Sequence, residues 1–186
     1  MMATISLGVA RLFRHAVDME RRTGDLWDNR ASAEAVIDHL AAAIEGVTNL
    51  PGMPAIKKSG NAMICQVGLE RRRYLWHADD STSQYVLECQ SMLIAGTKNM
   101  TLQDVAPENL DKPETWERIR PVVLAYGVEG ILIQFMPLKE PSVEWKSNWN
   151  GAVGNIAVRV QVCVGGQTAE RIIRPSANAT VVGHET

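Results

Sequence analysis

The feature that most constrains the fold of this chain is a run of alternating residues near its C-terminus. From Ile156 to Val164, valine or isoleucine occupies every second position, and alanine, arginine, glutamine and cysteine fill the positions between them. Successive side chains of a β-strand point to opposite faces, so a period of two places all the branched residues on one face. The pattern therefore predicts a β-strand with one buried face.

Turn signals flank this strand on both sides. Asn150-Gly151 is the dipeptide that most favours a two-residue type I′ turn, because both turn positions need a positive φ. The segment before it, 142–149, also alternates, and we expect it to pair with 152–160 as a hairpin. Gly165-Gly166 then turns the chain into 169–174. These signals predict a C-terminal three-stranded antiparallel meander.

Further extended segments precede this meander. They are short apolar or alternating runs, and they cover residues 62–69, 71–78, 84–95 and 131–136. The links between the first three segments are too short for a helical crossover. We therefore expect these three to form an antiparallel meander of their own.

Helical periodicity occurs in two parts of the sequence. The N-terminal region 3–48 carries two apolar stripes of helical period, and Thr23-Gly24 between them predicts a break, so we expect a hairpin of two helices. Candidate N-caps for the second helix are Asp28, Asn29 and Ser32. A third helix is predicted after Asp111, a candidate N-cap, because Pro113 suits a first turn and Pro121 would end the helix early.

Together these elements predict an α+β fold. We expect an antiparallel sheet of about six strands, with two or three helices packed on one face. A length of 186 residues is that of one domain or two very small ones, and we expect a single domain over residues 1–174. Residues 175–186 are small and polar, which predicts a mobile tail.

Composition and charge argue against several classes of protein. No apolar run reaches the ~18 residues of a membrane span, and we expect no membrane association and no signal peptide. A formal charge of −2 provides no general attraction to nucleic acid. Three scattered cysteines predict reduced thiols in a reducing, cytoplasmic compartment, with no disulfide framework and no zinc site. No motif indicates a metal or another cofactor.

One local cluster of titratable residues could support catalysis. His77 is followed closely by Asp79 and Asp80, a combination that could act in acid–base chemistry or bind a metal. The other interpretation is the end of a strand followed by a turn, because Asp-Asp-Ser is ordinary turn sequence. We favour the turn and keep a small enzyme as an alternative function.

A basic run interleaved with aromatic residues covers Arg71–Trp76. Positive charges for phosphates beside rings for base stacking are typical of single-strand RNA binders, so an RNA-binding module is a further alternative. Residues of one strand divide between two faces, and we expect Arg71, Arg73 and His77 on an exposed face and Arg72, Tyr74 and Trp76 on the other. Arginine and aromatic residues are also enriched at protein interfaces. The candidate interface residues of this run are therefore Arg71, Arg73, Tyr74 and Trp76.

Two tryptophans provide another candidate surface. Trp145 and Trp149 are four residues apart in the predicted strand 142–149, so they would share a face. Packing in the core is the default interpretation of two such rings. On an exposed face they would mark an interaction surface, because few monomers leave two tryptophans open to solvent.

The order of the predicted elements resembles that of the tail-terminator (tail-completion) proteins of long-tailed bacteriophages. The resemblance covers residues 31–166 and depends on the layout and on the valine-rich strand that follows Trp145–Gly151. It implies a ring-forming, non-catalytic component of a phage tail or neck. We therefore expect a structural or assembly protein that acts as a homo-oligomer, with other structural proteins as partners and no nucleic acid.

Overall fold

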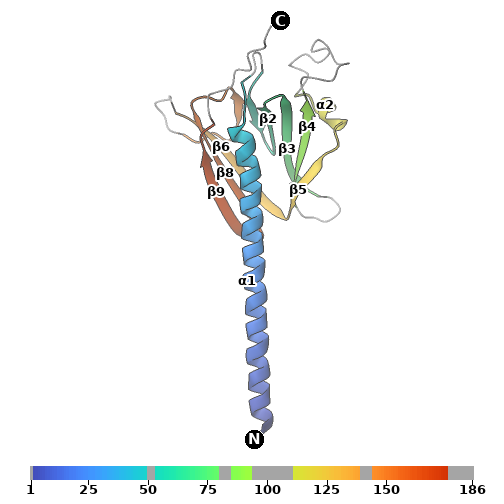
Figure 1. Cartoon of the computed structure of the whole chain (residues 1–186), viewed down its shortest axis with the longest axis vertical. Helices are drawn as coiled ribbons and strands as arrows, with labels where there is room; N and C mark the ends of the chain where they lie inside the picture. The colour runs from blue at the N-terminus through green and yellow to red at the C-terminus, as the bar shows by residue number, and fades with distance from the viewer. Residues whose placement is uncertain (1, 50–52, 80–84, 94–110, 139–143, 176–186) are drawn as a thin grey trace.

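The computed structural model of the chain describes residues 2–49, 53–79, 85–93, 111–138 and 144–175. It has the predicted mixed α+β class: one long helix, α1 (Met2–Glu45), packs at its C-terminal end against two antiparallel sheets (Figure 1). A second helix, α2 (Pro113–Glu117), is short. Neither helix combines the length and the apolar content that are needed to cross a membrane.

Six strands form the larger sheet. They are β1 (Ile56–Ser59), β2 (Ala62–Val67), β3 (Glu70–Ala78), β4 (Tyr85–Leu93), β5 (Val122–Tyr126) and β7 (Trp149–Gly151). Their order across the sheet is β5-β4-β3-β2-β1-β7, and every neighbouring pair is antiparallel. The meander predicted for 62–69, 71–78 and 84–95 is confirmed.

Three strands form the smaller sheet, in the order β6-β8-β9. They are β6 (Val128–Pro137), β8 (Ile156–Val164) and β9 (Gln167–Ile173). Gly165 and Gly166 connect β8 to β9 with φ angles of 53° and 74°, a region that glycine adopts at little cost. The turn predicted at these two glycines is confirmed, and so is the central alternating strand.

The hairpin predicted at Asn150-Gly151 is wrong. Both residues lie within β7, where Asn150 is opposite Lys57 and Gly151 is opposite Ile56 of β1. Strand β8 pairs instead with β6 on one side and β9 on the other. The physical reason is that β6 is far more apolar than 142–149, so its pairing with β8 buries more apolar surface.

The predicted helical hairpin is also wrong, because α1 continues through Thr23-Gly24. A glycine inside a helix costs only about 1 kcal/mol relative to alanine, which the flanking turns can offset. The candidate caps Asp28 and Ser32 consequently become exposed positions of one helix. The turn between β8 and β9 approaches α1 at Asn29, and the N-terminal part of the helix projects beyond the sheets (Figure 1). We call residues 2–28 the stalk.

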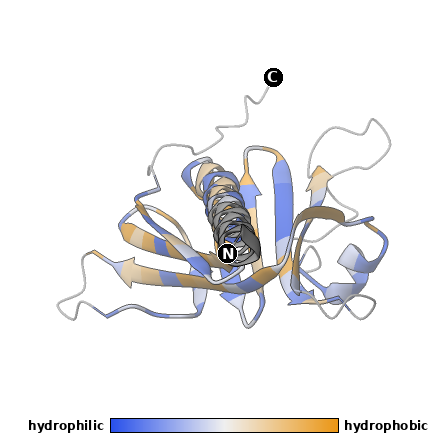
Figure 2. Ribbon diagram, turned by 90° about the horizontal axis from the view of Figure 1, so that it is seen from below, coloured by the Kyte–Doolittle hydropathy of each residue, from blue (hydrophilic) through white to orange (hydrophobic). Residues whose placement is uncertain are grey.

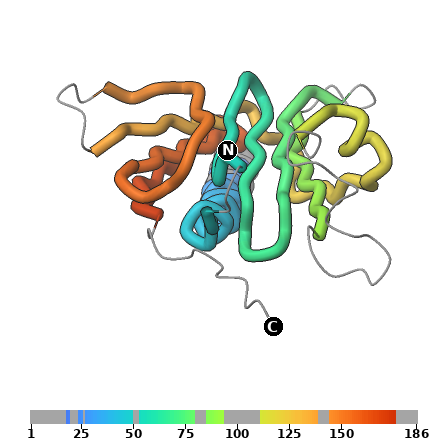
Figure 3. The backbone as a smooth tube through the Cα atoms, turned by 90° about the horizontal axis from the view of Figure 1, so that it is seen from above, coloured from blue at the N-terminus to red at the C-terminus, as the bar shows by residue number. Residues whose placement is uncertain are grey.

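One hydrophobic core joins α1 to both sheets. Viewed along α1, the sheets lie on either side of the helix (Figure 2), and the β1–β2 hairpin lies between the smaller sheet and strands β3–β5 (Figure 3). Trp149 of β7 stacks on Phe135 of β6 with ring centroids 5.7 Å apart, which links the two sheets. Asn49, just after α1, exchanges two hydrogen bonds of 2.8 and 3.1 Å with the backbone of Val153.

The helix α2 begins at an N-cap of Lys112, so the cap predicted at Asp111 is wrong. The side chain of Gln90 in β4 donates hydrogen bonds to the carbonyls of Trp116 at 2.9 Å and Ile119 at 2.7 Å. These bonds hold the short helix on the sheet. The Asp111 carboxylate makes a different contact, described below.

Only one residue of the predicted tail 175–186 belongs to the described part of the chain. This residue, Pro175, has a buried side chain. Residues 176–186, and with them the predicted mobility, lie outside the described residues.

Candidate functional site

The basic run of β3 divides between the two faces of the larger sheet. Tyr74 and Trp76 are buried, and both belong to the core between the sheet and α1. Arg72 lies beside Tyr74, as predicted, and forms an ion pair with Glu70 at 2.7 Å. The two rings therefore pack inside the chain and present no surface on which bases could stack.

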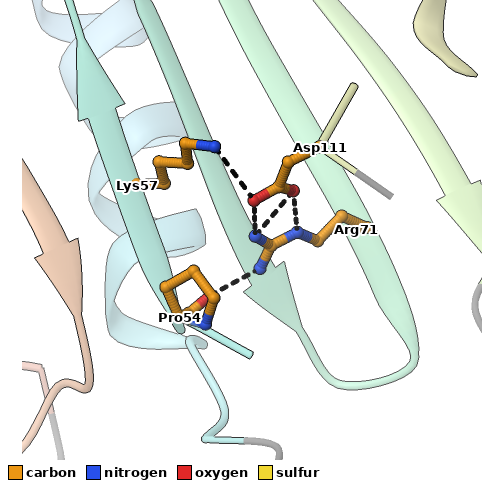
Figure 4. Close-up of polar contacts among 4 residues, drawn as sticks. All are labelled: Pro54, Lys57, Arg71 and Asp111. Atoms are coloured by element: carbon orange, nitrogen blue, oxygen red, sulfur yellow. Dashed lines mark hydrogen bonds and ion pairs between the residues drawn. The ribbon is translucent and has the colours of Figure 1, made fainter. Parts of the chain in front are cut away.

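The opposite face of β3 carries Arg71 and Arg73. The prediction that Arg71 is exposed is wrong, because its relative exposure is 0%. Pro54 and Asp111, from the segments before β1 and α2, converge on its guanidinium group (Figure 4). Arg73 is half-buried, and its guanidinium group donates to the side-chain oxygen of Gln90 at 3.3 Å.

The Arg71 guanidinium group is held by three oxygen atoms. Its Nε and Nη2 donate to the Asp111 carboxylate at distances of 2.9–3.1 Å, and its Nη1 donates to the Pro54 carbonyl at 2.8 Å. The Nζ of Lys57 lies 3.6 Å from the same carboxylate. Such bidentate, charge-assisted hydrogen bonds are among the strongest in proteins. Because they join three segments that are distant in sequence, we interpret this cluster as a structural anchor.

His77 pairs with a residue that the sequence did not suggest. Its Nε2 lies 3.2 Å from the Glu88 carboxylate on β4, and its Nδ1 lies 2.9 Å from the Ala78 carbonyl. The hydrogen bond to Ala78, followed by that to Glu88, raises the pKa of His77. Asp79 adds a weaker attraction, and Asp80 lies outside the described residues. Nowhere in the described chain do three or more histidine, cysteine or acidic side chains converge as a metal site would require.

Trp145 and Trp149 do not share one strand face as predicted, because only Trp149 lies in a strand. Trp149 is the inter-sheet residue that stacks on Phe135. Trp145 lies under the guanidinium group of Arg159, whose carbon is 4.5 Å from the ring centroid. Both rings are half-buried by contacts within the chain, and their role in an interface stays a prediction.

The cysteines are free thiols, as predicted. Cys65 is completely buried between α1 and the larger sheet, and this burial raises the pKa of its thiol to about 12. Because the thiolate is the reactive form, Cys65 is an inert core residue.

An open cavity of about 470 Å³ lies between α1 and the β4–β5 pair. His39, which lines it, meets the hydroxyl of Tyr74 at 3.3 Å, and no motif in the sequence marks this contact. Burial, and next the charge of Arg72, lowers the pKa of His39, so its ring is neutral at pH 7. The hydroxyls of Ser32 and Tyr126 are the other polar side-chain groups of the lining, which contains no carboxylate.

Exposed apolar side chains gather at the β4–β5 edge of the larger sheet. Val122 and Tyr126 of β5 are each 62% exposed, and Tyr85 of β4 is also exposed. Among the described strands, β5 is hydrogen-bonded only to β4 and therefore forms one edge. Its sequence, Val-Val-Leu-Ala-Tyr, contains no charge. This apolar run is the signal of the edge in the sequence, and no catalytic or basic motif marks it.

Comparison with known proteins assigns no family, because no family model, no curated protein and no solved structure matches this chain.

Proposed function

We propose that the protein is a non-enzymatic structural component that assembles with further copies of itself, and that the β4–β5 edge is one contact between copies. The observation that carries the proposal is the exposed, uncharged strand β5. An edge strand presents unpaired backbone N–H and C=O groups, and soluble proteins usually protect such edges with charged residues, proline or a covering segment. Pairing with a second copy would satisfy these groups and bury Val122 and Tyr126.

The other candidate sites lend less support to the alternative functions. An RNA-binding surface would need free guanidinium groups and open rings, whereas the arginines of 71–73 are engaged within the chain and the rings of Tyr74 and Trp76 are buried. An enzyme with an activated nucleophile would need a base beside the nucleophile and a third group that orients the base. The pair of His77 and Glu88 lies on an open strand face, away from the cavity that His39 lines.

A place in a virus particle is part of the same proposal. It is supported by the order of elements, which resembles tail-terminator proteins of long-tailed bacteriophages, and it would put the oligomer in a phage tail or neck. Assembly would take place in a reducing cytoplasm, which suits the free thiols. Negative-stain electron microscopy of the purified protein tests this part, because a ring is the expected particle.

Sedimentation velocity of the purified chain over a wide concentration range tests self-association. We expect the wild type to form oligomers and Val122→Lys to shift the distribution toward smaller species, because lysine on an edge strand disfavours pairing. Leu69→Lys is the matched control, since Leu69 is an exposed leucine in the turn between β2 and β3 and not at the edge. A wild type that is monomeric throughout, or an equal effect of the two variants, would contradict the proposal.

A further inference from the structure

A single stripe of residues, spaced alternately by four and three, runs along all of α1. Its members are Ile5, Val9, Leu12, Ala16, Met19, Thr23, Leu26, Arg30, Ala33, Ile37, Leu40 and Ile44. Apart from Thr23 and Arg30, they are apolar. An average spacing of 3.5 residues keeps such a stripe on one line of a helix and is typical of a coiled coil.

The C-terminal part of this stripe is already a buried interface. Its last four residues, Ala33, Ile37, Leu40 and Ile44, are at most 2% exposed and belong to the core shared with the sheets. The body of the protein reaches down α1 as far as Asn29, which the β8–β9 turn approaches closely at Gly165. The stalk therefore continues the same stripe past the end of the sheets (Figure 1).

The stalk exposes large apolar side chains to solvent. It extends about 40 Å at 1.5 Å per residue. Met19 on the stripe is 69% exposed, and Trp27 beside it is 67% exposed. Most helical stability in proteins comes from the packing of an apolar face, and helices without such packing are marginal. A stalk of this length is thus expected to pack its stripe against another surface.

We propose that the stalk pairs antiparallel with the stalk of a second copy, as a two-stranded coiled coil. The inference rests on the proposed function, since it requires that the chain associate with itself. The first argument for this orientation is steric. From Ala33 onward each stripe faces the sheets of its own chain. In a parallel pair those sheets would occupy the path of the second helix, whereas an antiparallel pair holds the two bodies at opposite ends.

The distribution of charge favours the same orientation. Residues 2–14 contain Arg11 and Arg14 and no acidic residue, whereas residues 15–28 contain four acidic residues and two arginines. An antiparallel pair places the basic half of each stalk along the acidic half of the other. A parallel pair would place like charge along like charge, which disfavours association.

The stripe also specifies a register. When Val9 is opposite Met19 of the second copy, Leu12 is opposite Ala16 and Leu26 is opposite Met2, so three of the four kinds of layer are apolar. The fourth pairs Thr23 with Ile5. In this register each N-terminus ends level with Leu26 of the other copy, just before the body begins at Asn29. The length of the stalk therefore matches the length of stripe that the sheets leave uncovered.

Cysteine cross-linking of the full chain tests this pairing. Val9→Cys and Met19→Cys are prepared separately, mixed, oxidised mildly and analysed on a non-reducing gel, with native cysteines contributing equally to every sample. We expect a cross-linked dimer from the mixture and none from Met19→Cys alone. Two copies of position 19 would lie about 15 Å apart along the axis, beyond the ~7 Å Cα separation that a disulfide allows. Asp18→Cys mixed with Val9→Cys is the control, because Asp18 is exposed but lies off the stripe.

The outcomes separate this inference from the proposed function. Self-cross-linking of Met19→Cys would indicate a parallel pair and overturn the inference. If Asp18→Cys and Met19→Cys cross-link equally well with Val9→Cys, the inference is also overturned. The same holds if no cross-link forms in a chain that sediments as an oligomer. In these cases the proposed function would stand. A chain that sediments as a monomer would overturn both.

Discussion

The anchor between Arg71 and Asp111 leads to the sharpest prediction about stability. Arg71 is 0% exposed and the Asp111 side chain is 11% exposed, so both charges are largely removed from water. Asp111→Ala would leave a buried guanidinium group with the Pro54 carbonyl as its remaining acceptor. Removing one member of a buried ion pair costs about 3–5 kcal/mol, because the other charge stays buried without its partner. We expect a loss of unfolding free energy in this range.

A substitution of the other member of the pair, Arg71→Met, and the double variant test the reasoning further. Arg71→Met should cost less than Asp111→Ala, because the carboxylate keeps Lys57 at 3.6 Å and retains some exposure. The double variant removes both charges, and replacing a buried ion pair by apolar groups is often close to neutral. We therefore expect it to lose much less stability than the sum of the single variants, with a coupling energy toward the upper end of the usual range of about 0.5–3 kcal/mol.

Urea unfolding followed by far-UV circular dichroism measures these differences. Arg30→Ala is the control, since Arg30 and Glu34 form an exposed pair one helical turn apart, and such pairs contribute about 0.3–0.5 kcal/mol. If Asp111→Ala loses less than about 1 kcal/mol, the value of an ordinary hydrogen bond, or if the two single effects simply add, the pair does not anchor the segment before α2.

Three further predictions concern turns, protonation and thiol reactivity. Gly165→Ala should lower the free energy of unfolding by about 1–2 kcal/mol in the same urea assay, because residue 165 has a positive φ and closely approaches α1. Gly151→Ala is the control and should be nearly neutral, since its new methyl group would make ordinary contacts of 3.6–3.7 Å. NMR titration should give His77 a pKa above 6.5, and Glu88→Gln should lower this pKa. The protonated His77 should stabilise the fold fully below pH 6.5, and this stabilisation is lost as the pH rises through the pKa of the folded state. Cys65 should resist a thiol reagent in the native protein and react after unfolding, and rapid native labelling would contradict its burial.

Periodicity and short links predicted the β2–β3–β4 meander and the turn from β8 to β9, but they did not predict that β8 pairs with β6. The alternation of β8 fixes which side chains face the core, and two glycines at its end determine the turn into β9. The other neighbour of β8 depends on which segment buries most apolar surface beside it. That comparison favours β6, which is distant in sequence, over the nearby segment 142–149. A local turn signal such as Asn150-Gly151 is too weak to override it.

The site residues show the same limit of local patterns. Alternation correctly separated Arg71 and Arg73 from Tyr74 and Trp76, which lie in the core. It could not predict exposure, because the covering segments, which contain Pro54 and Asp111, have no regular period and come from distant parts of the sequence. The stripe of α1 was visible in the sequence, but Gly24 suggested a break that the helix does not have.

The two proposed contacts together determine what kind of assembly can form. An antiparallel pair of stalks is two-fold symmetric, so it joins two copies and closes on itself. Antiparallel pairing of β5 with β5 of another copy would be two-fold as well. A chain with two different two-fold contacts binds two neighbours, and repeated use of both contacts produces either a closed ring with an even number of copies or an open chain. Loss of the β5 contact in Val122→Lys should then leave a dimer joined by its stalks, whereas a ring with an odd number of copies would exclude this combination of contacts.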